Sequence, residues 1–244
     1  MENIEKLKKV IEKSERIVFF GGAGVSTESG VKDYRSEDGM YNTVKEYGVS
    51  PETILSHTFL FAHPDVFYDF YYKYFLMEEI SPNAAHYALA KLEETGKLSA
   101  VITQNIDGLH QAAGSKKVYE LHGTTSRHYC ADCGEEYPLD ALKALRGGVP
   151  KCRRCGGFVR PDVVMYEEAL EEKTVIGAIN AIAEADLLII GGTSLAVYPA
   201  ASYLRYFRGN SIVLINRSAT AYDDRADLIF REKIGEVLSA VVFR

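Results

Sequence analysis

Six short apolar runs constrain the fold most strongly, because each ends in glycine or polar residues and helical sequence separates most of them. They are RIVFF (16–20), LSAVITQN (98–105), VYELHG (118–123), ADLLIIGG (185–192), SIVLIN (211–216) and DLIF (227–230). Short runs rich in Val and Ile are typical of strands buried on both faces of a parallel sheet. Strands that alternate with helices therefore predict an α/β fold built on a doubly wound parallel sheet.

The helical sequence lies between these strands and in two insertions. Apolar spacing predicts helices over 4–14, 58–62, 65–80, 82–94, 170–183, 198–207 and 235–242. A chain of 244 residues with 47% hydrophobic side chains can bury more than one core. We expect a larger domain of residues 1–31, 96–125 and 161–244. The smaller domain would combine a helical module (32–95) with a cysteine-containing module (126–160).

The helix predicted over 65–80 carries seven aromatic residues between Phe67 and Phe75. This is more than one helix face needs for burial. Packing in the core explains them most simply, and the wall of an apolar groove is the alternative.

The net charge of −6 argues against binding of nucleic acid or an anionic membrane. No apolar stretch is long enough for a transmembrane helix, and the charged amphipathic start does not have the features of a signal peptide. We therefore expect a cytoplasmic protein without nucleic-acid or membrane partners. The oligomeric state stays open, with a monomer as the expectation.

A glycine-rich stretch, GGAGVSTESGVKDYRS (21–36), follows the first strand. Its first three glycines allow a tight turn and a close backbone approach to a ligand, and Ser26, Thr27 and Ser29 can cap a following helix. Such a turn at a helix start is a phosphate site in outline. The third glycine of G-x-G-x-x-G would fall on Thr27, so a plain turn between strand and helix is the alternative.

Four cysteines form two C-x-x-C pairs, Cys130 with Cys133 and Cys152 with Cys155, which are separated by 18 residues. This spacing is typical of a zinc-ribbon site. Four thiolates leave no coordination position for water, so the zinc, one per chain, is expected to be structural. Free thiols and a redox dithiol are the alternatives, and no thioredoxin-like context surrounds either pair.

Three further segments begin at the carboxyl ends of predicted strands, where open α/β sheets bind ligands. They are TQNIDGLHQAAG (103–114), ELHG (120–123) and GGTSLAVYPA (191–200). With GAGVS (22–26), the cysteine module and LIN (214–216), they make the chain resemble the sirtuin family of NAD-dependent protein-lysine deacylases, in a short, bacterial-type form. The resemblance implies a Rossmann-like NAD-binding domain and a smaller zinc-containing domain.

Sirtuins consume NAD, so the resemblance implies that nicotinamide leaves and that acyl-lysine becomes free lysine and O-acyl-ADP-ribose. The motif match makes His122 the general base, and an imidazole with a pKa of about 6.5 suits that role. Asn105 joins it in catalysis, and Asn105 and Asp107 would line the nicotinamide pocket. Gln104 would meet the ribose.

The resemblance assigns further residues to NAD. Ala23 and Gly24 would lie against the pyrophosphate, while Asn216 would hold the adenine ribose. The other NAD-binding residues implied are Gly22, Thr27, Tyr34, Arg35, Ile106, Gly192, Thr193, Ser194, Arg217, Lys233 and Ile234. Among these, Thr27, Thr193 and Ser194 would donate to phosphate, Arg35 would clamp the diphosphate, and Tyr34 would cover the nicotinamide side.

An acetylated protein or peptide would enter between the two domains as an added strand. The residues implied to contact it are Val163, Val164, Met165, Tyr166, Glu167, Leu195 and Val197. Desuccinylating sirtuins carry a tyrosine and, three residues later, an arginine in the aromatic helix. Tyr68 and Tyr71 match these positions here, so we expect acetyl or another short neutral acyl group.

The chain departs from the family pattern at three places. The usual I-P-D-F-R-G reads VKDYRS (31–36), F-G-E reads Tyr166-Glu167-Glu168, and Arg217-Ser218 follows Asn216. Two other functions share the NAD site: mono-ADP-ribosyl transfer to protein, and non-catalytic sensing of NAD or ADP-ribose. A hydride-transferring dehydrogenase is disfavoured, because the glycine spacing of its fingerprint is not met.

Overall fold

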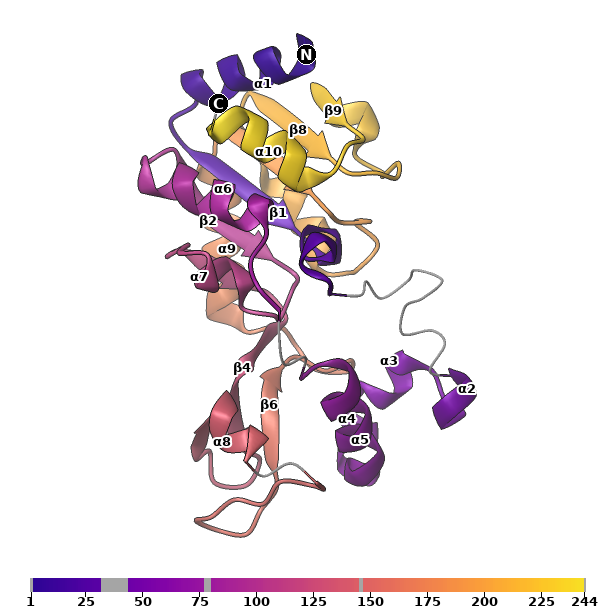
Figure 1. The fold of residues 1–244 in the computed structure, drawn as a ribbon. Helices are drawn as coiled ribbons and strands as arrows, with labels where there is room; N and C mark the ends of the chain where they lie inside the picture. The colour runs from indigo at the N-terminus through magenta and orange to yellow at the C-terminus, as the bar shows by residue number, and fades with distance from the viewer. Residues whose placement is uncertain (1, 32–43, 77–79, 145–146, 244) are drawn as a thin grey trace.

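Parallel strands form the larger of two sheets, in the order β3-β2-β1-β7-β8-β9 (Figure 1). In this computed structural model, which describes residues 2–31, 44–76, 80–144 and 147–243, all six predicted runs form strands of this sheet. They are β1 (Ile17–Gly21), β2 (Leu98–Thr103), β3 (Val118–Glu120), β7 (Leu187–Gly191), β8 (Ser211–Ile215) and β9 (Leu228–Phe230). The strand order reverses between β1 and β7, so the predicted doubly wound sheet is confirmed.

Helices cover both faces of this sheet. One face packs against α1 (Glu2–Lys13), α6 (Ala84–Glu94) and α10 (Ile234–Val242). The other packs against α9 (Glu172–Glu184) and a 3₁₀ helix, Ala200–Tyr206. Alternate residues of β1 serve the two cores: Phe19 lies in the first and Phe20 in the second. The sheet is therefore buried on both sides, as its apolar sequence predicts.

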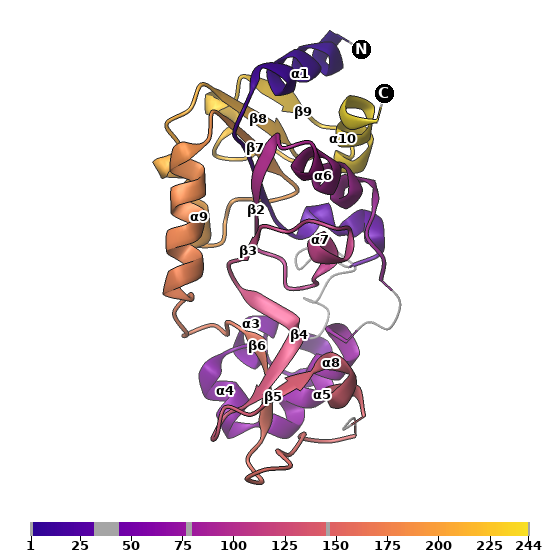
Figure 2. The same ribbon diagram turned by 90° about the vertical axis from the view of Figure 1, so that its left-hand side faces the viewer.

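A second lobe lies beyond the carboxyl ends of the large sheet, and β4 passes from one lobe into the other (Figure 2). Its antiparallel sheet has the order β5-β4-β6. The elements of this lobe are α2 (Val44–Tyr47), α3 (Pro51–Ile54), α4 (His57–Ala62), α5 (Pro64–Tyr74), β4 (Gly123–Cys130), β5 (Glu136–Pro138), α8 (Leu139–Lys143) and β6 (Val159–Val163). The aromatic residues of α5 form its core together with Cys130 and Cys152, so core packing explains the aromatic surplus.

Three expectations need correction. The predicted division assigns α6 to the small domain, but Leu89 and Leu92 of this helix lie in the core beneath the large sheet. Up to Val31, where this described range ends, two 3₁₀ turns, Ala23–Val25 and Thr27–Ser29, form in place of the predicted α-helix, and neither has a side-chain cap. The segment predicted as a helix over 198–207 is a 3₁₀ helix. The other domain limits stay predictions.

Two short helical segments lie in loops of the larger lobe. Helix α7 (Leu109–Ala112) follows β2 and packs against α6. A further 3₁₀ turn, Asp223–Arg225, precedes β9. Within the described ranges, the structure has no helix with the length and apolar character needed to cross a bilayer.

Candidate active site

The loops that follow β1, β2 and β7 meet at the carboxyl ends of these strands of the large sheet. Gly21 pairs with Thr103 on one side and with Gly191 on the other, so the three strands end level with one another. The sequence segments singled out as ligand-binding begin at these ends. The topology alone therefore brings residues some 80 positions apart into one site.

Two glycines allow the loops after β1 and β7 to touch through their backbones. The Gly24 N–H donates to the Gly192 carbonyl at 2.8 Å. A Cβ on Gly24 would lie 2.8 Å from the Gly192 Cα, and Gly192 itself has a φ of 58°. Only glycine satisfies both requirements without strain. The close approach leaves a bare backbone surface of the kind that a dinucleotide pyrophosphate needs, so these residues fit NAD.

A hydrogen-bonded chain orients the two residues assigned to nicotinamide. Asn105 Nδ2 donates to Ser26 Oγ at 2.9 Å, and Ser26 Oγ donates to Asp107 Oδ2 at 2.7 Å. Asp107 Oδ1 accepts from the Leu109 N–H at 2.9 Å. Ser26 is fully buried. The sequence predicts Ser26 as a helix cap and does not reveal that this serine links Asn105 to Asp107.

The ring of His122 is fixed by a main-chain carbonyl. Its Nδ1 lies 2.9 Å from the Gln104 oxygen. Because a carbonyl oxygen can only accept, Nδ1 carries the proton and Nε2 is the basic nitrogen. Burial lowers the pKa of His122 below its ordinary value, although the bond to Gln104 opposes this. The imidazole is therefore neutral and suited to take up a proton at neutral pH.

Gln104 and Thr193 join the β2 and β7 loops. Gln104 Nε2 donates to Thr193 Oγ1 at 3.2 Å, and the same oxygen accepts from the Leu195 N–H. Thr193 is buried, while Ser194 is exposed. The carbonyl of Ile106 accepts two bonds from Thr125, which anchors the loop that carries Asn105 and Asp107.

The residues assigned to adenosine lie farther along the same carboxyl end of the sheet, beyond β7. Asn216 follows β8, and its N–H donates to the Phe230 carbonyl. Lys233 immediately precedes α10, which begins at Ile234. A Glu28 carboxylate accepts from the Gly235 N–H at 3.1 Å, which ties this helix to the glycine-rich loop. Thr27 and Arg217 are exposed. Tyr34 and Arg35 lie outside the described residues.

The segment predicted to pair with peptide follows β6. Tyr166 differs from the expectation, because its N–H donates to the Leu55 carbonyl and its own carbonyl accepts from the His57 N–H. Its main chain is thus already paired. In the described part of the chain, the carbonyls of Val164 and Glu167 and the Glu167 N–H have no hydrogen-bond partner. These groups form an edge that an added strand can use.

Backbone strain marks both segments assigned to the substrate. Among the described residues, positive φ angles outside glycine occur at Glu167 (76°) and Leu195 (56°). Strained non-glycine residues concentrate at functional sites. Glu167 stands where the sirtuin pattern has glycine, so the chain keeps the conformation that glycine would favour. Val163 ends β6, Met165 is buried, and Val197 is half-buried in the second segment.

Tyr68 and Tyr71 do not reach this site. Each side chain is 1% exposed. The Tyr68 hydroxyl donates to the Val159 carbonyl, and the Tyr71 hydroxyl bonds His128 Nε2 at 3.0 Å. Both phenols are used inside the smaller lobe, so this structure offers neither of them to an acyl group.

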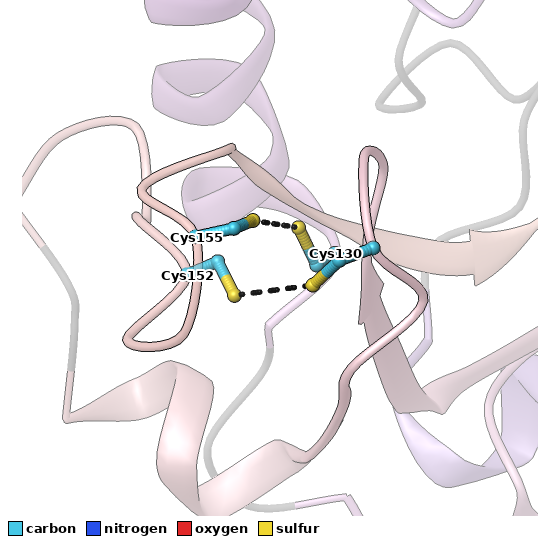
Figure 3. Close-up of side chains that lie close together, drawn as sticks. Cys130, Cys152 and Cys155 are labelled. Carbon is cyan, nitrogen blue, oxygen red and sulfur yellow. Dashed lines mark hydrogen bonds between the residues drawn. The ribbon is translucent and has the colours of Figure 1, made fainter.

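The four cysteines converge at the far end of the smaller lobe. Their sulfurs lie within 4.8 Å of one another, with Cys130 Sγ 3.4 Å from Cys155 Sγ and Cys133 Sγ 3.7 Å from Cys152 Sγ. Figure 3 shows the Cys130, Cys152 and Cys155 sulfurs facing a common centre. A tetrahedral zinc with Zn–S bonds of about 2.3 Å would separate its sulfurs by about 3.8 Å. The donor set and spacing therefore fit one zinc ion.

The cysteine cluster is supported by a tyrosine, Tyr137, which the cysteine motif did not indicate. The Tyr137 hydroxyl donates to Cys152 Sγ at 3.3 Å and accepts from the Arg153 N–H at 2.9 Å. Tyr137 is buried in the same core. Such outer donors orient metal ligands and reduce the charge on a thiolate.

Comparisons with known proteins agree with this architecture. A family model described as the Sir2 family matches residues 22–199. A protein of Clostridium acetobutylicum named NAD-dependent protein deacetylase is 54% identical over 242 residues, which is 99% of each chain. One of the same name from Cutibacterium acnes is 53% identical over 97% of this chain and 96% of its own.

Solved structures give the same result. A Sir2 protein with a p53 peptide and NAD⁺ is 37% identical, with a TM-score of 0.87 over 98% of this chain and 96% of that one. Another, with a deacetylated p53 peptide and 3′-O-acetyl ADP ribose, has a TM-score of 0.88 at 37% identity and the same coverage. With its sequence matched almost from end to end and its fold shared, this chain belongs to the Sir2 family, the sirtuins.

Proposed function

We infer that this protein removes acetyl groups from lysine side chains of proteins and consumes NAD in doing so. Acetyl-lysine, NAD and one water molecule give the free lysine, nicotinamide and O-acetyl-ADP-ribose. The inference rests most directly on the neutral His122 ring, whose Nε2 is left basic by the bond from Nδ1 to Gln104. Two relatives whose sequences are 54% and 53% identical to this chain carry the name NAD-dependent protein deacetylase.

When bound, NAD would supply the carbon that accepts the acyl oxygen. The described residues would hold and orient the NAD molecule. The Gly24 and Gly192 backbones would lie against the pyrophosphate, and Asn105 and Asp107 would fix the carboxamide. His122 Nε2 would take a proton from a ribose hydroxyl once nicotinamide has left. General-base assistance of this kind contributes about 10²- to 10⁴-fold to the rate.

The peptide would bind as a strand between the segments that follow β6 and β7. Val164 and Glu167 offer main-chain groups that have no partner among the described residues on one side, and the loop with Leu195 and Val197 lies on the other. Main-chain pairing gives affinity with little reading of side chains. We therefore propose loose sequence specificity among acetylated proteins.

A short neutral acyl group suits the charges of the smaller lobe. A buried acyl carboxylate would need a cationic partner. Among the described residues, Arg160 is the buried guanidinium, and Glu168 and the Val163 carbonyl already bind it. We propose a preference for acetyl over succinyl, with propionyl and butyryl as further candidates.

One mass-spectrometric assay tests the function. The protein is incubated with NAD and peptides of one sequence that carry acetyl-, butyryl- or succinyl-lysine. O-Acetyl-ADP-ribose and deacetylated peptide are the expected products, with the highest kcat/KM for a neutral acyl group. Labelled ADP-ribose retained on protein without deacetylation would instead support ADP-ribosyl transfer. Succinyl-lysine as the best substrate would refute the account of the acyl preference.

A further inference from the structure

Two adjacent glutamates fasten the segment after β6 to the rest of the smaller lobe. Glu168 binds the Arg160 guanidinium through both oxygens, at 2.6 and 2.8 Å. The same carboxylate accepts from the Met165 N–H at 2.8 Å. Arg160 is 6% exposed, so this is a largely buried, charge-assisted pair. The fold thus closes the segment into a tight loop around one ion pair.

Glu167 also fastens the loop to α4, beside the contact of Glu168 Oε1 with His57 Nδ1 at 2.8 Å. Glu167 Oε2 accepts from the Thr58 N–H at 2.9 Å and from Thr58 Oγ1 at 2.7 Å. Main-chain bonds to Leu55 and His57 lie beside this contact. In this way Glu167 keeps a φ of 76°, although that conformation is strained for a residue with a Cβ.

The loop that these two carboxylates fasten also carries the main-chain groups that have no partner within the described ranges. Val164 and Glu167 carry these groups, and both belong to the fastened loop. We propose that Glu167 is a positioning residue, whose side chain binds Thr58 so that its own main chain stays preset for pairing with the acetylated peptide. This inference rests on the proposed function. It assigns to the glutamate a task that glycine at this position could not perform.

The competing role for Glu167 is direct recognition. Its side chain is exposed, and a carboxylate beside a peptide could bind a basic side chain of the substrate. The two roles need different properties of the side chain at position 167. Positioning needs an acceptor for Thr58, which an amide supplies. Recognition of a basic residue needs the negative charge, which an amide does not have.

The test compares Glu167→Gly, Glu167→Gln and Thr58→Val in the full chain with zinc bound. The probes are two fluorescent acetyl-lysine peptides, one with arginine beside the modified residue and one with alanine. Positioning predicts that Glu167→Gly weakens peptide affinity and raises peptide KM about 5-fold, the loss expected of one capping interaction. The KM for NAD and kcat should change less than about 2-fold.

Glu167→Gln should recover most of the affinity, and Thr58→Val should reproduce part of the loss although Thr58 is not placed at the peptide. Both peptides should respond alike. Amide hydrogen exchange of residues 163–168 should accelerate in Glu167→Gly and stay near the wild-type rate in Glu167→Gln. The control is Glu46→Gln, which breaks an exposed ion pair with Lys73 in the same lobe and should alter none of these values.

Unchanged peptide affinity and exchange in both Glu167→Gly and Thr58→Val would overturn the proposal. So would a Glu167→Gln variant as weak as Glu167→Gly, with the effect confined to the arginine peptide, because that outcome indicates direct recognition. Failure of the proposed function would be seen separately, as absence of NAD-dependent deacetylation in the wild-type protein. The exchange data would still decide whether Glu167 fixes the loop.

Discussion

His122 combines a fixed tautomer with a lowered pKa, and the chemistry assigned to it depends on both. Replacing it by alanine removes the basic Nε2 but leaves the glycine loops untouched. We expect His122→Ala to lower turnover by about 10²- to 10⁴-fold, with NAD affinity measured by calorimetry near the wild-type value. His63→Ala, which removes an exposed histidine from the smaller lobe, is the matched control. Turnover near wild type in His122→Ala would refute the assignment.

The pH profile tests the same residue in another way. A general base works in its unprotonated form, so activity falls when the pH drops below its pKa. Because burial lowers the pKa of His122 from the ordinary value of 6.5, the acid limb of kcat/KM should lie below pH 6.5 and activity should persist at pH 6.5. The profile is measured with acetyl-peptide at fixed NAD. An acid limb above pH 6.5 would contradict the effect of burial.

A substitution at Gly24 tests the backbone contact between the loops that follow β1 and β7. A methyl group there would meet the Gly192 backbone at 2.8 Å, so the two loops must separate. We expect Gly24→Ala to weaken NAD binding at least about 10-fold and to lower the melting temperature. Gly148→Ala is the control, because its Cβ would have open space and no unusual φ is required. Equal effects of the two variants would show that the close approach is unimportant.

At the scale of elements, the cysteine module joins β4 to β6 and shares the aromatic core of α5. Elemental analysis should give one zinc per chain. Tyr137→Phe removes the hydroxyl that donates to Cys152 but keeps the packed ring. We expect zinc transfer to a chromogenic chelator to become about 10-fold faster in this variant, while Tyr129→Phe, which changes another tyrosine of the lobe, should keep the wild-type rate. Active protein without zinc would contradict the metal assignment.

The elements differ in how far the sequence determines them. The six strands were predicted because strands buried on both faces need continuous apolar runs, which local sequence displays. The α-helix predicted after Gly24 is replaced by two 3₁₀ turns among the described residues. Bonds to Gly192 and Asp107, which lie far away in the sequence, hold this loop in place of local capping. Packing of α6 on the large sheet depends on contacts with α10, which its own spacing cannot reveal.

In the candidate site too, local sequence reveals some residues, whereas others depend on contacts between distant segments. The four cysteines lie together as their motif predicts, because the spacing of metal ligands is set by the coordination they must reach. The roles of His122 and Asn105, which the resemblance to sirtuins implies, stay predictions. Ser26 and Tyr137 were missed, since their partners are assigned only once distant segments fold together. The same holds for Tyr166, whose main chain pairs with a segment more than 100 residues earlier.

At the scale of the whole molecule, the lobes have separate cores. The two clusters beside the large sheet share no residue with the cluster of α5 and the cysteines. Calorimetry should therefore resolve two transitions. NAD should raise the midpoint of the larger lobe, and a zinc chelator should lower that of the smaller lobe, because each ligand stabilises the unit that binds it. A single transition that shifts with both additions would mean that the lobes unfold together.

His122 also stands at the junction of these lobes. Its ring is held by Gln104 of the larger lobe, while its main-chain carbonyl accepts from the Val164 N–H at the start of the substrate segment. The next residue, Gly123, has a φ of 75° and so close an approach to Asp162 that no side chain fits. The proposed base is thus bonded through its ring to the larger lobe and through its main chain to the substrate segment. A substitution that displaced either contact would therefore change the distance between the base and the substrate strand.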